Sequence, residues 1–395
     1  MNFAAMPKLE TDQETVAPTI LPGATIGMVG GGQLGRMFAM AAASMGYKVI
    51  VFCGNDDEPA AQVADGVVTG ELTDHEAVKE FASHCDVITL EFENIPAETI
   101  QRCSEYAPTY PSYSVLQTAQ NRLTEKSTFK NAGLPVTPFL EVSNSDQLID
   151  FARQHNWPVI LKSATSGYDG KGQHRVQDEE HARAIDWSAT DLWIAEQCID
   201  FCKEISMIVA RRPDGVAECF PAMENVHRNH ILDITTTPAE IPDQLTKQAH
   251  EVAIATANLL DVVGLLCVEM FVVEQNGQFE LMINEVAPRP HNSGHLTIEA
   301  FQTSQFQQHL RAICSLPLGS TELAVGGAAM ANLLGDHWDG GAPAWDRALN
   351  VQGVNLHLYG KSVAKAGRKM GHLTATATDT DLARQMVIDA RKQLE

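Results

Sequence analysis

Two segments far apart in the sequence carry the residue types that nucleotide chemistry requires. Residues 167–173 read Gly-Tyr-Asp-Gly-Lys-Gly-Gln. Their three glycines let backbone N–H groups turn toward phosphate oxygens, and Lys171 adds a positive charge. Residues 284–295 include the carboxylate of Glu285. Because Mg²⁺ prefers one or two carboxylates together with phosphate oxygens, the two segments together indicate a nucleotide bound with Mg²⁺.

A second carboxylate, Glu269, is expected to lie near the first on a β-hairpin. Residues 265–273 and 278–285 have the composition of strands, and Asn276-Gly277 between them is a strong hairpin signal. The number of residues in the turn decides which side chains of the two strands share a face.

Two registers are open for this hairpin. A two-residue turn would place Glu269 opposite Asn284 and send Glu285 to the other face of the sheet. A three-residue loop with Gly277 in the left-handed conformation would pair Glu269 with Ile283 and leave Glu285 diagonal to it, roughly 7–8 Å away on the same face. We expect the three-residue loop, because carboxylates at that separation suit one or two shared Mg²⁺ ions, and burying them without a metal would be costly.

Further residues point to the same nucleotide site. Lys162 ends an apolar strand predicted over residues 158–163, and a strand lysine beside a glycine loop often reaches nucleotide phosphates. Without Lys162, the glycine loop would also fit an ordinary hairpin. Residues 196–199 lie where a hinge could present backbone donors and acceptors to adenine, but Glu196 and Glu204 also fit solvated strand ends.

The glycines at residues 30–35 match the G-x-G-x-x-G pattern between a strand and a helix. In a nicotinamide-dinucleotide fold, an acidic residue should end the second strand. Cys53 ends it here, and Asp56 and Asp57 follow later in a loop. We therefore do not expect a nicotinamide cofactor, although the helix N-terminus remains a candidate site for the phosphate of another ligand.

The elements that position these residues change in type along the chain. Strand, helix and strand are predicted over residues 24–29, 33–45 and 47–53, an α/β opening that indicates a parallel sheet. An α+β mixture follows. The other predicted elements are helices at 74–84, 97–105, 122–132, 244–260 and from about 381, and strands at 86–92, 158–163, 192–196, 204–211 and 355–359. We expect a disordered tail (1–22), a Rossmann-like domain (23–121), a second domain (122–316) with a mobile loop (164–173), and a small C-terminal domain (317–395).

Composition excludes several classes of protein. The net charge of −22 argues against binding DNA or RNA, which depends on clustered basic residues. No apolar run approaches the roughly 18 residues of a membrane span, and the acidic start of the chain does not read as a leader. The eight cysteines show no zinc-type spacing. We expect a soluble cytoplasmic protein with reduced thiols and no membrane or nucleic-acid partner.

Five motifs in order along the chain carry a specific resemblance. They are Gly-Gly-Gly-Gln-Leu-Gly-Arg-Met at 30–37, Glu-Phe-Glu-Asn at 91–94, the loop at 167–173, residues 284–295, and Gly-Arg-Lys-Met-Gly-His at 367–372. The chain resembles the N5-carboxyaminoimidazole ribonucleotide synthetases, ATP-grasp ligases of purine biosynthesis. The resemblance runs from about residue 24 to residue 395, so the acidic first 22 residues lie outside it.

The resemblance implies a three-domain ATP-grasp fold with an N-terminal Rossmann-like (pre-ATP-grasp) parallel sheet and a small C-terminal domain, usually as a homodimer. It implies that ATP, bicarbonate and Mg²⁺, as two ions with ATP, serve to carboxylate 5-aminoimidazole ribonucleotide. It also implies the synthetase part alone, without the mutase domain found in fungal fusions. Two alternatives stay open: another ATP-grasp ligase, such as a formate-dependent glycinamide ribonucleotide transformylase, and a non-catalytic nucleotide sensor.

The resemblance also assigns roles to individual residues. ATP binding falls to Arg122, Lys162, Gly167, Gly170, Lys171, Gly172, Gln173, Glu196, Gln197, Cys198, Ile199, Glu204, His227, Asn284 and Glu285. Metal binding falls to Glu269 and Glu285, and catalytic roles fall to Tyr168, Asp169, Arg289 and Lys361. Substrate binding falls to Gln33, Leu34, His291, Asn292, Ser293 and Arg368. Lys361 and Arg368 also fit solvated charges, but basic residues are scarce in this acidic chain, which favours an anion site for both.

Overall fold

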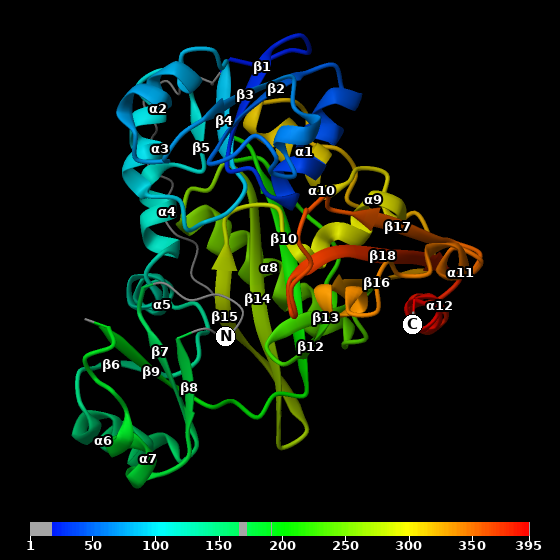
Figure 1. Cartoon of the computed structure of the whole chain (residues 1–395). Coiled ribbons are helices and arrows are strands. Elements are labelled where there is room, and N and C mark those ends of the chain that lie inside the picture. The colour runs from blue at the N-terminus through cyan, green and yellow to red at the C-terminus, as the bar shows by residue number, and fades with distance from the viewer. Residues whose placement is uncertain (1–17, 166–171, 191, 395) are drawn as a thin grey trace.

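The structure is a computed structural model that describes residues 18–165, 172–190 and 192–394. The strands of this described part form three sheets, which lie at the top, at the lower left, and through the centre and right of the molecule in Figure 1. Among the described residues, no helix is both long and apolar enough to cross a lipid bilayer.

The first sheet is parallel throughout and has the strand order β3-β2-β1-β4-β5. Its strands are β1 (Thr25–Val29), β2 (Lys48–Cys53), β3 (Gly66–Thr69), β4 (Val87–Leu90) and β5 (Thr109–Tyr110), and its helices are α1 (Gln33–Ser44), α2 (His75–Ala82), α3 (Ala97–Cys103) and α4 (Tyr113–Ala119). Alternate residues of β1 enter two cores, since Ile26 and Met28 pack with α1 and Val29 packs with α2 and α3. Burial on both faces is typical of parallel sheets.

The second sheet is small and antiparallel, with the order β6-β9-β7-β8. It consists of β6 (Phe139–Val142), β7 (Val159–Ser163), β8 (Gln173–Val176) and β9 (Trp193–Gln197), preceded by helix α5 (Arg122–Asn131) and accompanied by α6 (Ser145–His155) and α7 (Glu179–Ala184). Helices α6 and α7 pack with one of its faces. The predicted glycine loop connects β7 to β8, but residues 166–171 lie outside the described part of the chain.

The third sheet is the largest and runs β15-β14-β10-β12-β13-β16-β18-β17, with β11 beside β10. Its strands are β10 (Lys203–Arg211), β11 (Ala217–Cys219), β12 (Met223–Arg228), β13 (Ile231–Thr237), β14 (Gly264–Gln275), β15 (Gln278–Ala287), β16 (Gly327–Leu334), β17 (Val354–Leu358) and β18 (Lys369–Ala377). The accompanying helices are α8 (Asp243–Leu259), α9 (Thr297–Ala300), α10 (Gln305–Ile313), α11 (Trp345–Ala348) and α12 (Thr380–Lys392), with the 3₁₀ helix η2 (Asn292–Leu296) before α9.

The C-terminal strands continue this sheet and do not form a separate one. Strand β16 pairs antiparallel with β13, so the sheet crosses the expected domain boundary near residue 317 without a break. The cores are shared as well, because Phe306 and Leu310 of α10 and Tyr359 pack against α1 of the first sheet. The first and third sheets therefore share a core with the C-terminal part of the chain.

The β14–β15 hairpin does not have the expected three-residue loop. Gln275 pairs with Gln278, so Asn276-Gly277 is a two-residue turn, and both of its residues have positive φ. That prediction was wrong. The extra residue lies inside the strand instead: a β-bulge at Asn284 shifts the register, so that Glu269 pairs directly with Glu285. The two carboxylates therefore share a face, as expected, but for a different reason.

Candidate active site

A cavity of about 1050 Å³ opens where the three sheets meet. This volume lies at the upper end of small-molecule sites, which is large enough for a nucleotide beside a second ligand. Most of the residues predicted from the sequence line it: Gln33, Leu34, Arg122, Lys162, Gln173, Glu196, Gln197, Cys198, Ile199, Glu204, His227, Glu269, Asn284, Glu285, Arg289, His291 and Asn292.

Other predicted residues lie elsewhere. Ser293 is fully buried behind His291, and Gly172 lies at the end of the loop with a φ of +72°. The Arg368 guanidinium donates a 2.7 Å hydrogen bond to the Val363 carbonyl. The Lys361 ammonium donates a 2.6 Å hydrogen bond to the backbone carbonyl of Lys369, a residue that does line the cavity. Gly167, Tyr168, Asp169, Gly170 and Lys171 lie outside the described residues.

Two carboxylates face each other across β14 and β15. Burial would raise the pKa of Glu269, but the hydrogen bond from His291 and the positive charges around the carboxylate lower it overall. The Glu285 side chain is exposed to the open cavity, yet its pKa is raised, first by the protein around it and then by the charge of Glu269. Two adjacent carboxylates that line one cavity are a donor set suited to a hard cation.

Glu125 of α5 adds a third carboxylate beside Glu285, which the sequence did not reveal. Its side chain lines the cavity and accepts a hydrogen bond from the backbone N–H of Val286. Burial, reinforced by the charge of Glu285, raises the pKa of Glu125 to about 8. The metal-free protein therefore keeps this carboxyl largely protonated at neutral pH.

This raised pKa predicts how stability depends on pH in the metal-free protein. The folded chain holds the Glu125 proton up to a pH of about 8, whereas the unfolded chain releases it near 4.5. The free energy of unfolding should therefore fall as the pH rises through this window, by up to about 1.4 kcal/mol per unit. Glu125→Gln should reduce that slope in urea unfolding with a metal chelator present. Glu280→Gln, an exposed change on β15, should leave the slope as it is in the parent.

Two lysines hold Glu196, which is 3% exposed and is therefore not a solvated strand end. Its Oε2 lies 3.2 Å from Nζ of Lys162 and 3.5 Å from Nζ of Lys126. Lys126 is itself buried and also donates to the Thr137 hydroxyl (2.7 Å) and the Asn284 carbonyl (3.0 Å). A lysine on the apolar face of α5, between Leu123 and Phe129, was the sequence signal for this interaction.

The adenine end of the expected nucleotide site has an aromatic wall. Residues 196–199 line the cavity at the end of β9. Phe201 and Phe271 line it as well and stack with a centroid separation of 4.6 Å and an interplanar angle of 11°. Neither phenylalanine was predicted, because the two are 70 residues apart and only the pairing of β10 with β14 brings them together.

Glu204 and His227 form a pair on β10 and β12. Nδ1 of His227 lies 2.7 Å from Oε2 of Glu204, and both residues line the cavity. Burial opposes a charged imidazole, but the hydrogen bond and charge of Glu204 raise the pKa of His227 overall. The pair therefore presents a polar edge suited to hydroxyl or phosphate groups.

Arg289 is held by a bidentate ion pair with Glu93, 196 residues away in sequence. Its Nε and Nη2 donate to the two carboxylate oxygens, and Nη1 donates to the Pro290 carbonyl at 3.0 Å. Burial alone would raise the pKa of Glu93, but the guanidinium lowers it. The pair joins the loop after β4 to the segment after β15 and fixes the cation in the cavity wall.

The glycine turn before α1 is engaged by the protein itself. The backbone N–H groups of Gly32 and Gly35 donate to the carboxylate of Glu91. A Cβ at Gly32 would lie 2.6 Å from Glu91 Oε1, so the close approach requires glycine. The expectation that this helix N-terminus is open to a ligand phosphate is therefore wrong for these two N–H groups. Burial raises the pKa of Glu91 overall, although the bonds from Gly35 and Gly32 and, last, the charge of Lys361 oppose this rise.

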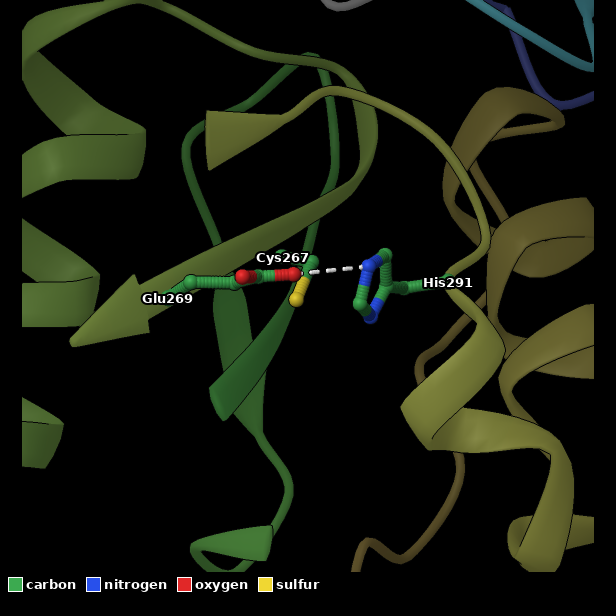
Figure 2. Close-up of side chains that lie close together, drawn as sticks. All are labelled: Cys267, Glu269 and His291. Atoms are coloured by element: carbon green, nitrogen blue, oxygen red, sulfur yellow. Dashed lines mark ion pairs between the residues drawn. The ribbon is translucent and has the colours of Figure 1, made fainter. Parts of the chain in front are cut away.

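Cys267, Glu269 and His291 form a compact cluster, with one candidate ligand atom from each within 4.8 Å of the others (Figure 2). Nε2 of His291 lies 2.9 Å from Oε1 of Glu269. Nδ1 accepts the backbone N–H of Ser293, so the ring proton of a neutral imidazole belongs on Nε2, which then has no lone pair for a metal. Burial also raises the pKa of the Cys267 thiol. The cluster is therefore a hydrogen-bonded support for Glu269.

Asn292 points to a missing polar partner. Both atoms of its side-chain amide are buried and have no hydrogen-bond partner among the described residues, and the residue lines the cavity. Buried polar groups are nearly always satisfied, so this amide is suited to contact a bound ligand.

Three domain families match in succession along the chain. They are the ribonucleotide synthetase preATP-grasp domain at residues 23–120, the ATP-grasp domain at 127–306, and the phosphoribosylaminoimidazole carboxylase C-terminal domain at 328–386. Solved structures agree with this order. An N5-carboxyaminoimidazole ribonucleotide synthetase in complex with ADP superposes with a TM-score of 0.88 at 43% identity and covers 95% of this chain and 98% of that one. The Aspergillus clavatus enzyme in complex with ADP and 5-aminoimidazole ribonucleotide gives 0.85 at 32% identity, covering 94% and 98%.

Sequence relatives give the same family. The bifunctional purine synthesis protein purC/E of Dictyostelium discoideum is 42% identical over 372 residues, which are 89% of this chain but 37% of that protein. The N5-carboxyaminoimidazole ribonucleotide synthase of Bacillus subtilis is 42% identical over 358 residues, or 90% of this chain and 92% of that protein. Because this chain and the Bacillus subtilis protein are 42% identical over nearly their whole lengths, the chain belongs to the N5-carboxyaminoimidazole ribonucleotide synthetase family of ATP-grasp ligases.

Proposed function

We propose that the chain carboxylates 5-aminoimidazole ribonucleotide in an ATP-dependent reaction with bicarbonate. The products are N5-carboxyaminoimidazole ribonucleotide, ADP and phosphate, in de novo purine biosynthesis. The observation that carries this proposal is one cavity that brings Gln33, at the start of α1, together with Lys162 of the second sheet and Glu269 of the third. A nucleotide and a second substrate can meet in it.

The reaction needs ATP because bicarbonate is a weak electrophile. Bicarbonate reacts poorly with amines, and transfer of the γ-phosphoryl group of ATP to it gives carboxyphosphate, whose phosphate leaves readily. Such a transfer needs positioning and charge neutralisation more than covalent catalysis. Lys162 lies in the cavity and can exchange part of its contact with Glu196 for nucleotide phosphate oxygens.

Arg289 is suited to hold the anionic intermediate. Glu93 and Pro290 use three of its five N–H donors, and the other two remain for an anion such as bicarbonate or carboxyphosphate. The bidentate pair with Glu93 fixes the guanidinium before a ligand arrives, which lowers the reorganisation needed during the reaction. Exclusion of water and placement of the amine beside the carboxyl carbon then supply the proximity effect.

We propose Mg²⁺ as the cation held by Glu269 and Glu285, with Glu125 close to the second of them. When bound there, Mg²⁺ supplies positive charge that neutralises phosphoryl oxygens. The residues fit this ion because hard carboxylate oxygens from adjacent strands face one cavity.

The proposed phosphate site for the ribonucleotide involves Lys361 and Arg368. The Lys361 ammonium donates to the carbonyl of Lys369, which lines the cavity, whereas Arg368 would have to exchange its bond to the Val363 carbonyl for the ligand. Asn292 offers its unpartnered amide to the same ligand.

We further propose a homodimer of 43.0 kDa subunits in the cytoplasm, with domain limits at residues 23–121, 122–316 and 317–395. The eight cysteines are free thiols, which suits a reducing compartment. Sedimentation equilibrium tests the subunit number, because a mass of one subunit would exclude the dimer.

The function is tested by the substrate dependence of ADP release. We expect ADP formation to require 5-aminoimidazole ribonucleotide and bicarbonate together, because the cavity has room for the second ligand beside the nucleotide. Equal ADP formation with formate and glycinamide ribonucleotide would favour the transformylase. Nucleotide binding without any turnover would favour a non-catalytic sensor.

A further inference from the structure

We propose that Ser206, Asn225 and Thr235 are positioning residues: they form a buried hydrogen-bond chain that holds His291 as its Nε2–H tautomer, and this ring in turn holds Glu269. The inference deepens the proposed function, since it rests on the metal-binding role of Glu269. None of the three residues lines the cavity.

The chain crosses neighbouring strands of the third sheet. The Thr235 hydroxyl on β13 donates to Oδ1 of Asn225 on β12 at 2.9 Å, and Nδ2 of Asn225 donates to Oγ of Ser206 on β10 at 3.1 Å. The Ser206 hydroxyl donates to Oγ of Ser293 at 2.8 Å. Thr235, Ser206 and Ser293 are fully buried, so water does not compete for these bonds.

Two donors reach the same ring nitrogen from the end of this chain. Because Ser293 accepts the proton of Ser206, its own hydroxyl proton is available to Nδ1 of His291, 2.8 Å away. The backbone N–H of Ser293 also points at Nδ1, at 3.3 Å. Because a backbone N–H can only donate, this second contact makes Nδ1 an acceptor whichever way the Asn225 amide is oriented. With Nδ1 accepting, Nε2 carries the proton and donates to Glu269 at 2.9 Å.

The consequence for the site is a fixed carboxylate. Groups that orient an imidazole or carboxylate next to a metal commonly change metal affinity or activity by about 10- to 100-fold when they are removed. If the ring carried its proton on Nδ1, the lone pair of Nε2 would face Oε1 of Glu269, and the two acceptors would repel each other. Oε1 of Glu269 would then lose its hydrogen-bond donor, and the carboxylate would no longer be held in one orientation. Figure 2 shows this carboxylate beside Cys267 and opposite the ring of His291.

The direct test is the tautomer of His291 in the full-length protein. ¹⁵N-histidine NMR should show Nε2 protonated and Nδ1 bare, with the signal assigned by its loss in His291→Gln. In Ser206→Ala, the His291 signal should shift toward a mixture of tautomers. Ser206→Thr keeps the hydroxyl, so its His291 signal should match that of the parent. A parent protein with the proton on Nδ1 would overturn the proposal. This readout needs neither metal nor substrate.

The kinetic test separates positioning from general damage to the core. Ser206→Ala should raise the Mg²⁺ concentration for half-maximal rate by about three- to tenfold, in line with the loss of one hydrogen bond at second remove from the carboxylate. Thr235→Val, at the far end of the chain, should act in the same direction but less, and it is the variant to use if Ser206→Ala does not fold.

Thr256→Val is the matched control, because its buried hydroxyl donates to the Val252 carbonyl within α8, outside the chain of bonds to His291. It should lower stability comparably and leave the Mg²⁺ dependence unchanged. If Ser206→Ala and Thr235→Val behaved like this control in both the spectrum and the Mg²⁺ dependence, the positioning role would be excluded. A changed tautomer with unchanged Mg²⁺ dependence would support the chain and overturn the metal role of Glu269.

Discussion

Glu285→Gln and Glu269→Gln should each lower turnover at saturating Mg²⁺ by at least about a hundredfold, the order lost when a preorganised electrostatic partner of the reacting group is removed. The two side chains are direct partners across β14 and β15 and line the cavity. Glutamine keeps the volume and can still occupy the site, but it removes one negative charge. The fold should persist, because the mutual repulsion that raises the pKa of Glu285 is also removed.

The hairpin supplies its own controls. Glu274→Gln on β14 and Glu280→Gln on β15 make the same chemical change on the same strands, at positions that do not line the cavity. Turnover and unfolding should match the parent in both. Activity within a few-fold of the parent in either cavity variant, measured by ADP release over a range of Mg²⁺, would contradict the metal assignment.

Elements with regular hydrophobic patterns were predictable from the sequence. The helices expected over residues 33–45 and 244–260 are α1 and α8, and each differs from the prediction by one residue at the ends. Strand β16 was not predicted. Its sequence, Gly-Ala-Ala-Met-Ala-Asn-Leu-Leu, is buried on both faces and so shows no alternation of apolar and polar residues. Its role as the bridge to the C-terminal strands depends on pairing with β13, which no local pattern encodes.

The register of the β14–β15 hairpin shows a different limit. Asn-Gly correctly indicates a tight turn, and with a two-residue turn simple counting sends Glu285 to the wrong face. Only the bulge at Asn284 places Glu285 on the same face as Glu269. A bulge is a tertiary outcome, in which the strand bends to place the carboxylate, and strand composition alone does not reveal it.

Most of the predicted site residues line the cavity, but many of their contacts could not be predicted from the sequence. Glu91, at the glycine turn, and Lys126, beneath Glu196, are charged residues that the fold uses internally. In sequence, Glu91 reads as an ordinary surface charge, and Lys126 differs from one only by its place on the apolar face of α5. The partners named here lie 56 to 70 residues away, so only the assembled sheets show that these charges organise the cavity wall.

The same logic makes Arg289 the cation whose loss should affect both stability and catalysis. Arg289→Met would leave the Glu93 carboxylate largely buried without its partner. Breaking a buried ion pair from one side typically costs about 3–5 kcal/mol, because an uncompensated charge remains. We therefore expect a loss of this order in the free energy of unfolding measured with urea, together with a loss of turnover.

A double variant separates these two effects. Glu93→Gln combined with Arg289→Met removes both charges, so most of the lost stability should return. Turnover should not return, because the guanidinium donors proposed to hold bicarbonate or carboxyphosphate are still absent. Arg153→Met is the control, since its partners Asp150 and Glu179 are exposed and such a pair contributes at most about 1 kcal/mol. If the double variant recovered turnover along with stability, Arg289 would serve only to join the two segments of the wall, and the anion would have to be held by another cation of the cavity.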